Sequence, residues 1–120
     1  MNMTLDEYQM KAMSTRMDSC RNLAYMLTGL TAEVGEVNDK IAKAIRKSEV
    51  SIDYNELIKY RREGSQLEYA IVMELGDCLW FLAGLADVFG YSLDEIAEWN
   101  IAKLASRQRR GVIDGNGDDR

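Results

Sequence analysis

The sequence contains no histidine and no proline among its 120 residues. Because histidine is absent, the chain cannot form a Ser-His-Asp or Cys-His catalytic centre, a zinc site of the usual kind or a Glu-x-x-His di-iron centre. Proline disrupts helix interiors and is common at the turns of β-rich folds, so its absence favours long helices. The hydrophobic pattern contains no convincing β-strand, and we expect an all-α protein.

Cysteine, positive charge and long apolar runs are scarce as well. Cys20 and Cys78 show no pairing or metal-binding pattern, so we expect two reduced thiols. The 15 basic and 20 acidic residues give a net charge of -5, which argues against binding to polymeric nucleic acid. No signal-peptide pattern opens the chain, and no apolar run reaches the ~18 residues that a membrane span requires. We therefore expect a cytoplasmic protein that does not bind membranes.

Hydrophobic spacing predicts four helices, over residues 4–17, 23–45, 66–89 and 92–109. The first and fourth begin with capping boxes, Thr4 with Glu7 and Ser92 with Glu95, and Gly90 ends the third. Residues 47–64 are polar and predict one short helical turn over residues 54–59. The expected fold is an all-α bundle of four to five helices. It forms a single domain over residues 1–110, with a Gly- and Asp-rich tail over residues 111–120.

Two acidic pairs interrupt the apolar helices. At 100° per residue, counted from Leu30 on the second helix and from Ile71 on the third, Glu33 and Glu74 lie near -60°, and Glu36 and Asp77 lie near -120°. If the two helices pack face to face, four carboxylates converge, and burying such charges costs several kcal/mol each or forces protonation. A hard divalent cation removes this conflict, and oxygen-only ligands favour Mg²⁺, with Mn²⁺ as a substitute. The alternative is two ordinary solvated helix faces.

The third helix is apolar on nearly all sides. A helix of this kind is buried in a larger bundle or at a subunit interface. Four helices are too few to cover it completely, so we expect a homo-oligomer, either a dimer or a tetramer, with the side of Trp80 and Phe81 at an interface.

The acidic pairs lie in the segments GLTAEVGEVNDKIAK and MELGDCLWFLAGLADVFGYSLDEIAEWNIAKLASR. Together these segments resemble the MazG-like nucleotide pyrophosphohydrolases of the all-α NTP pyrophosphatase superfamily, whose motif is E-x-x-E, a spacer and E-x-x-D. The resemblance covers residues 8–110. It implies Mg²⁺-dependent cleavage of a (d)NTP to the (d)NMP and pyrophosphate, in nucleotide-pool housecleaning. Glu33, Glu36, Glu74 and Asp77 are the implied metal ligands, and Glu33 or Glu36 takes a proton from the attacking water.

The resemblance also implies residues that contact the nucleotide. Asn100 and Lys103 match an N-x-x-K pattern of the family, and Arg107 lies on the same side of the fourth helix. Without the resemblance, these residues indicate a core asparagine with a hydrogen-bonding partner and two solvated cations. Lys40 lies near -80°, on the side of the acids, and either reaches phosphate or pairs with Glu36 at i, i+4.

A different class of function fits the same sequence. The chain could be a non-catalytic helical oligomerisation or regulatory module, whose acidic residues form salt bridges between subunits. The two hypotheses differ in what Mg²⁺ and substitution of the acids do to activity and to assembly.

Overall fold

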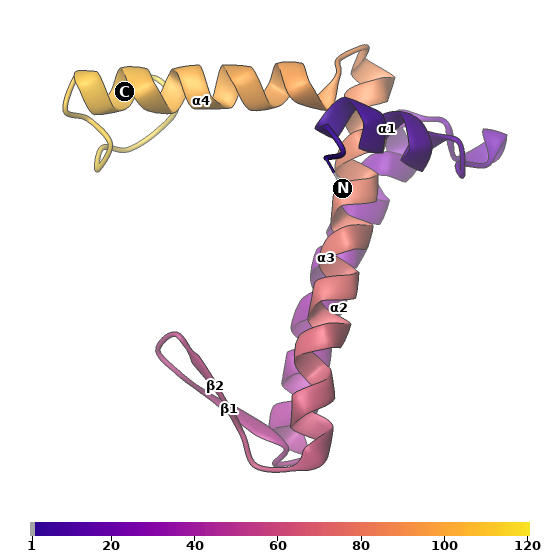
Figure 1. The fold of residues 1–120 in the computed structure, drawn as a ribbon, viewed down its shortest axis with the longest axis vertical. Helices are drawn as coiled ribbons and strands as arrows, with labels where there is room; N and C mark the ends of the chain where they lie inside the picture. The colour runs from indigo at the N-terminus through magenta and orange to yellow at the C-terminus, as the bar shows by residue number, and fades with distance from the viewer. Residues whose placement is uncertain (1) are drawn as a thin grey trace.

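A computed structural model describes residues 2–120 and is mostly helical, as expected. Two long antiparallel helices form its spine, a short helix packs beside them at one end, and a last helix leaves from that same end (Figure 1). Among the helices of residues 2–120, none combines the length and the apolar character that a membrane span requires. The elements in order are α1 (Leu5–Met13), the 3-10 turn η1 (Asp18–Cys20), α2 (Leu23–Arg46), β1 (Val50–Asp53), β2 (Glu56–Lys59), α3 (Arg62–Phe89) and α4 (Leu93–Arg109).

The predicted helix boundaries are accurate at most ends. Both capping boxes form, and Gly90 ends α3 in the left-handed conformation with φ of 81°. However, α1 is shorter than expected because the hydroxyls of Ser14 and Thr15 donate to carbonyls three residues back and the chain turns there. The helix α3 begins at Arg62, four residues before the expected start at Gln66.

The short helical turn expected over residues 54–59 is wrong, because residues 50–59 form a β-hairpin. β1 and β2 pair antiparallel, with Val50 opposite Lys59 and Asp53 opposite Glu56. The two-residue loop requires a positive φ, which Tyr54 adopts at 56°. The alternation of Val50 and Ile52 with polar residues is a short strand pattern, and a hairpin of this kind needs no proline.

The core consists of three small clusters along the helix pair. One lies near η1 (Cys20, Met26, Phe81), one beside the hairpin (Ala44, Val50, Leu67) and one beneath α1 (Ala83, Ala86, Leu93). Close approach of α2 and α3 depends on glycine, because a Cβ on Gly29 would overlap the Phe81 ring. Trp80 at 5.0 Å and Tyr25 at 5.7 Å, between ring centroids, hold that ring in place.

Trp80 and Phe81, which we expect at a subunit interface, pack largely within the chain itself: Phe81 is buried and Trp80 is half-buried. The Trp80 indole donates to the carbonyl of Ala12 and the hydroxyl of Thr15, and Phe81 is buried against Met26. The uncovered part of the spine is instead a surface that we call the apolar face. Its members are each at least 39% exposed: Leu23, Leu27, Val34 and Ile45 on α2, and Val72, Leu75, Leu82 and Phe89 on α3.

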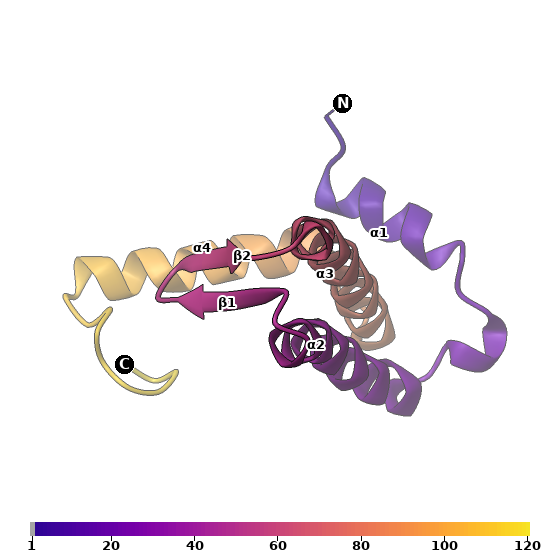
Figure 2. The ribbon, with the colours of Figure 1, turned by 90° about the horizontal axis from the view of Figure 1, so that it is seen from below.

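The hairpin and α4 project from the spine as two arms. Seen along the spine in Figure 2, both arms extend to one side, while α1 lies on the other. The radius of gyration is 17.8 Å, well above the about 14 Å of a compact domain of this length. After α4, residues 111–120 fold back onto it, and the Asp118 carboxylate accepts a hydrogen bond from Arg107.

The close contact at Gly29 leads to a stability prediction. Gly29→Ala should lower the free energy of unfolding by about 1–3 kcal/mol, because the added methyl group displaces a ring that is already packed. The matched change Gly35→Ala, on the same helix with open space around its Cβ, should raise it by about 0.5–1 kcal/mol through helix propensity. Urea denaturation followed by circular dichroism measures both values. Stabilisation by both changes would contradict the packing of Phe81 against Gly29.

Candidate metal and nucleotide site

Three of the four predicted acidic ligands meet at the interface of α2 and α3. Glu33 on α2 and Glu74 and Asp77 on α3 each offer one carboxylate oxygen, and these oxygens lie within 4.8 Å of one another. Glu33 and Glu74 are half-buried, whereas Asp77 is exposed. We call these three residues the carboxylate triad. The matched angles of the two acidic pairs therefore do bring side chains from different helices together.

The fourth acid, Glu36, lies one helical turn beyond Glu33 on α2. It is exposed and does not belong to the triad. Because its angle points it toward the solvent side of the groove between α2 and α3, it is accessible to water next to the triad.

The environment of the triad disfavours ionisation of Glu33. Partial burial, followed by the neighbouring carboxylates of Glu74, Asp77 and Glu36, holds the pKa of Glu33 above its ordinary value. The pKa of the adjacent Cys78 thiol is also raised, by burial and then by the same carboxylates. Excess negative charge is thus concentrated at one point on the spine.

One cation from the protein already approaches this charge. The Lys40 ammonium lies 3.3 Å from a carboxylate oxygen of Glu74, across the helix interface. The expected alternative partner of Lys40 was Glu36 on its own helix, but the ion pair recorded is with α3. One lysine does not balance three carboxylates, so the donor set remains suited to a divalent cation. Oxygen-only ligands of this kind fit Mg²⁺ or Mn²⁺.

The helix α1 lies beside the triad on the α3 side. Tyr8 of α1 lies near Asp77, and the pKa of its phenol is raised by burial and then by the charge of that carboxylate. Gln9 fixes α1 in place: its amide donates to the carbonyls of Ala83 and Tyr91 and accepts from the amide of Leu93.

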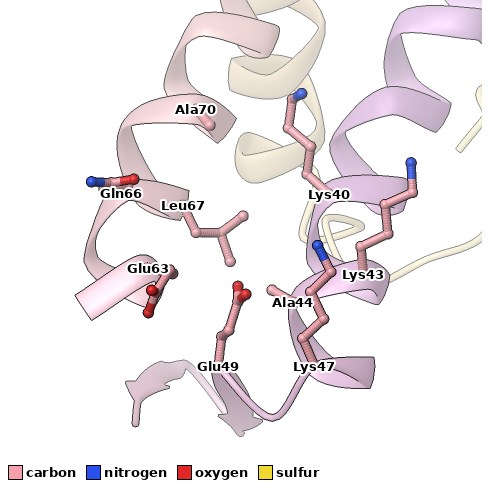
Figure 3. A pocket seen from close by; sticks show the side chains of 9 residues that line it. All are labelled: Lys40, Lys43, Ala44, Lys47, Glu49, Glu63, Gln66, Leu67 and Ala70. Carbon is pink, nitrogen blue, oxygen red and sulfur yellow. The ribbon is translucent and has the colours of Figure 1, made fainter. Parts of the chain in front are cut away.

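Toward the hairpin, α2 and α3 border a hollow of about 310 Å³ (Figure 3). Lys40, Lys43 and Lys47 line one wall, and Glu49 and Glu63 lie on the hairpin side. The sequence prediction did not include Lys47 or the two glutamates. The signal was present in the spacing of three and four residues, which places the three lysines on one helix face.

The predicted residues of α4 do not lie with the triad. Asn100 and Lys103 share a separate shallow pocket of about 240 Å³ with Ile96 and Trp99. Asp77 stands 12 residues before the end of α3, and Asn100 is seven residues into α4. Helical rise therefore puts them on the order of 20 Å apart within one chain.

The tail engages Arg107 of the same helix. Arg107 is only 5% exposed, and its guanidinium donates to the carbonyl and carboxylate of Asp118. Lys103 lies 3.7 Å from the same carboxylate. Both cations help to hold the pKa of Asp118 below its ordinary value, with Arg107 as the main cause.

Comparisons with known proteins bear on the family that the sequence resembles. Residues 21–112 match a family model described as the MazG nucleotide pyrophosphohydrolase domain. The chain is 34% identical to the Gene 37 protein of Mycobacterium phage L5, over 98% of this chain and 100% of that protein. No solved structure matches the chain significantly. The resemblance expected from the sequence is therefore confirmed.

The raised pKa of Glu33 leads to a pH prediction. In the metal-free protein, native Glu33 keeps its proton at pH values where the unfolded chain has released it. The free energy of unfolding should therefore fall as the pH rises from the ordinary value of 4.5 through the raised pKa. Mg²⁺ needs the ionised carboxylate, so its stabilising effect should grow over the same interval.

Thermal unfolding with and without Mg²⁺, between about pH 5 and pH 8, measures both trends. Glu33→Gln should flatten them, whereas Glu68→Gln, an exposed change on α3, should leave them intact. Equal pH and Mg²⁺ responses in the wild type and Glu33→Gln would contradict the assignment of Glu33.

Proposed function

Since the chain belongs to the MazG nucleotide pyrophosphohydrolase family, we propose that it is a Mg²⁺-dependent enzyme that cleaves a (d)NTP to the (d)NMP and pyrophosphate. The observation that carries the proposal is the triad, in which three carboxylates from two helices converge within 4.8 Å. We further propose that it acts in housecleaning of the cytoplasmic nucleotide pool and accepts Mn²⁺ in place of Mg²⁺.

In the proposed reaction, a water oxygen forms a bond to the α-phosphorus while the bond from that phosphorus to the bridging oxygen breaks. The water proton passes to a carboxylate, and pyrophosphate leaves. Glu33, Glu74 and Asp77, with Glu36 beside them, would hold the metal, whose positive charge would neutralise phosphate oxygens. Glu33 and Glu36 are the candidate bases, and the exposed position of Glu36 outside the triad supports it in this role.

Activity tests the proposal directly. Wild-type protein with Mg²⁺ should release pyrophosphate from at least one nucleotide in a panel of (d)NTPs. Glu36→Gln and Asp77→Asn should each lower kcat/KM by at least about a hundredfold, because each removes a ligand or the base. Glu68→Gln on α3 is the matched control and should retain activity. A wild type that releases no pyrophosphate from any nucleotide, even at high enzyme concentration, would contradict the proposal.

A second candidate is a non-catalytic oligomerisation or regulatory module. The extensive apolar face and the ion pair between Lys40 and Glu74 support it. In that case Glu36→Gln and Asp77→Asn should change the assembly state measured by analytical ultracentrifugation. The wild-type protein should hydrolyse no nucleotide.

We propose that the enzyme is a homo-oligomer, a dimer or a tetramer, in which the apolar face meets a second copy. At 100° per residue, counted from Leu30 on α2 and from Ile71 on α3, the members of this face lie between about 0° and +100°. This is the opposite side of the spine from the acids. The extended shape and the two uncovered arms support a second copy as the occupant. Pairing through this face leaves the triad open to solvent.

The same arrangement gives Asn100 and Lys103 a role as substrate-binding residues. Within one chain, α4 leaves on the side opposite α1 (Figure 2), and helical rise puts Asn100 on the order of 20 Å from Asp77. We propose that these two residues contact the sugar or phosphate of a nucleotide bound to another copy, while Lys40 contacts phosphate in its own chain. Arg107, which Asp118 engages together with Lys103, is the third residue of α4 that we propose for the substrate.

Complementation between variants tests this sharing. Asp77→Asn and Lys103→Gln should each be weakly active alone. After subunit exchange, half of randomly formed dimers are mixed and one of their two sites is intact, so about a quarter of wild-type activity should return. Gel filtration with one labelled variant verifies that exchange has occurred. Verified exchange without recovered activity would contradict a shared site.

A further inference from the structure

Two basic residues of α4 hold one carboxylate of the tail, which comprises residues 111–120. The ammonium of Lys103 and the guanidinium of Arg107 lie 3.7 Å and 3.2 Å from the same carboxylate oxygen of Asp118. The two cations are four residues apart and therefore share one face of the helix. Lys103 also lines the shallow pocket that contains Asn100. We call Lys103 and Arg107 the α4 anion site, and a carboxylate of the chain itself occupies it.

Asp118 does not pair with the whole guanidinium of Arg107. A single nitrogen, Nη2, donates to both the carbonyl and the carboxylate of Asp118. Within residues 2–120, the Nε atom of Arg107 is buried and has no recorded hydrogen-bonding partner. An unpaired buried donor is costly, and a guanidinium pairs best with an anion that accepts from two of its nitrogens at once. A phosphate group has three acceptor oxygens, so it can accept from Arg107 and Lys103 together.

Charge is the main attachment of the tail to α4. Residues 103–110 contain four basic residues and no acidic one, whereas the tail contains three aspartates and one arginine. Arg110 adds a hydrogen bond to the backbone oxygen of Arg120, at 2.7 Å. No tail residue is buried, and the side chain of Asp118 is 89% exposed. A segment without buried side chains opens locally at little cost, so the tail can leave α4 while the helix stays folded.

The tail has a defined shape despite its exposure. Gly117 adopts a positive φ of 80°, which glycine reaches without strain and which turns the chain just before Asp118. The guanidinium of Arg120 then donates to three backbone carbonyls of the tail. Because this loop follows α4 directly, it keeps the Asp118 carboxylate beside the α4 anion site at a high effective concentration (Figure 1).

We propose that the tail is a built-in competitor of the substrate: the Asp118 carboxylate takes the place of a nucleotide phosphate on Lys103 and Arg107, and the substrate displaces it. This inference rests on the proposed function, which assigns both residues to the substrate, and adds regulation to that site. A site that a tethered group occupies binds its ligand more weakly, in proportion to the fraction of molecules in which the site is free. The tail therefore raises KM and leaves kcat unchanged.

A purely structural role for Asp118 predicts the opposite result. If Asp118 only held Arg107 in a position suited to the substrate, loss of its charge would let the guanidinium turn away, and KM would rise. The two roles therefore differ in the sign of one kinetic change.

Steady-state kinetics of the full chain measure this sign. Asp118→Asn should lower KM for the nucleotide about three- to tenfold at unchanged kcat, because the competing charge is gone. Gly117→Ala should also lower KM, because alanine at a φ of 80° strains the tail while every charge is kept. Asp119→Asn is the matched control, since it makes the same charge change on the next exposed residue and should leave KM as it is. A raised or unchanged KM in Asp118→Asn would overturn the inference.

Release of the tail can also be measured without hydrolysis, by ¹⁵N relaxation of its backbone amides. Inorganic tripolyphosphate should displace Asp118, so that the order parameters of the Gly117 and Asp118 amides fall below about 0.6. Sodium chloride at the same ionic strength is the control for simple screening of the ion pairs. Asp118→Asn should show the mobile tail without any added anion.

The two measurements separate this inference from the proposed function. A tail that stays ordered in saturating tripolyphosphate would overturn the inference even if the protein hydrolyses nucleotides. Release by tripolyphosphate, but not by chloride, in a protein that hydrolyses no nucleotide would support the displaceable tail and contradict the proposed function.

Discussion

Repulsion among the carboxylates of Glu33, Glu74 and Asp77 is the constraint on which this structure depends. Their helices are brought together by apolar packing above and below, so the acids cannot separate without opening the core clusters at Met26 and Leu67. The cost appears in the raised pKa of Glu33, and the ion pair with Lys40 offsets only part of it. A fold that holds these carboxylates close together favours the binding of a cation.

The two sides of the spine have different tasks. By helical angle, the triad and the hollow lined by Lys40, Lys43 and Lys47 lie on one side and the apolar face on the other, and both arms extend away from α1 (Figure 2). This division is consistent with assembly through one side and nucleotide chemistry on the other. It also accounts for the separation of Asn100 and Lys103 from the triad, since α4 belongs to the side that we assign to assembly.

The sequence was sufficient to predict what helical periodicity controls. Spacing alone predicted the long helices and both capping boxes. It also predicted four converging acids, of which three do converge. The sequence was insufficient where the outcome depends on which element covers which. Trp80 and Phe81 satisfy the pattern of an interface, yet α1 and η1 cover them. The hairpin was missed because four-residue strands give a weak pattern, and the burial of Arg107 depends on a tail with no periodicity.

The central claim is that the triad holds a divalent cation beside a nucleotide. A crystal structure with Mn²⁺ and a nucleotide whose α–β bridge resists hydrolysis tests it most directly. We expect anomalous density for Mn²⁺ within bonding distance of Glu33, Glu74 and Asp77, with Lys40 moved from Glu74 to phosphate. Mn²⁺ and nucleotide bound elsewhere, with the Lys40–Glu74 pair intact, would contradict the account.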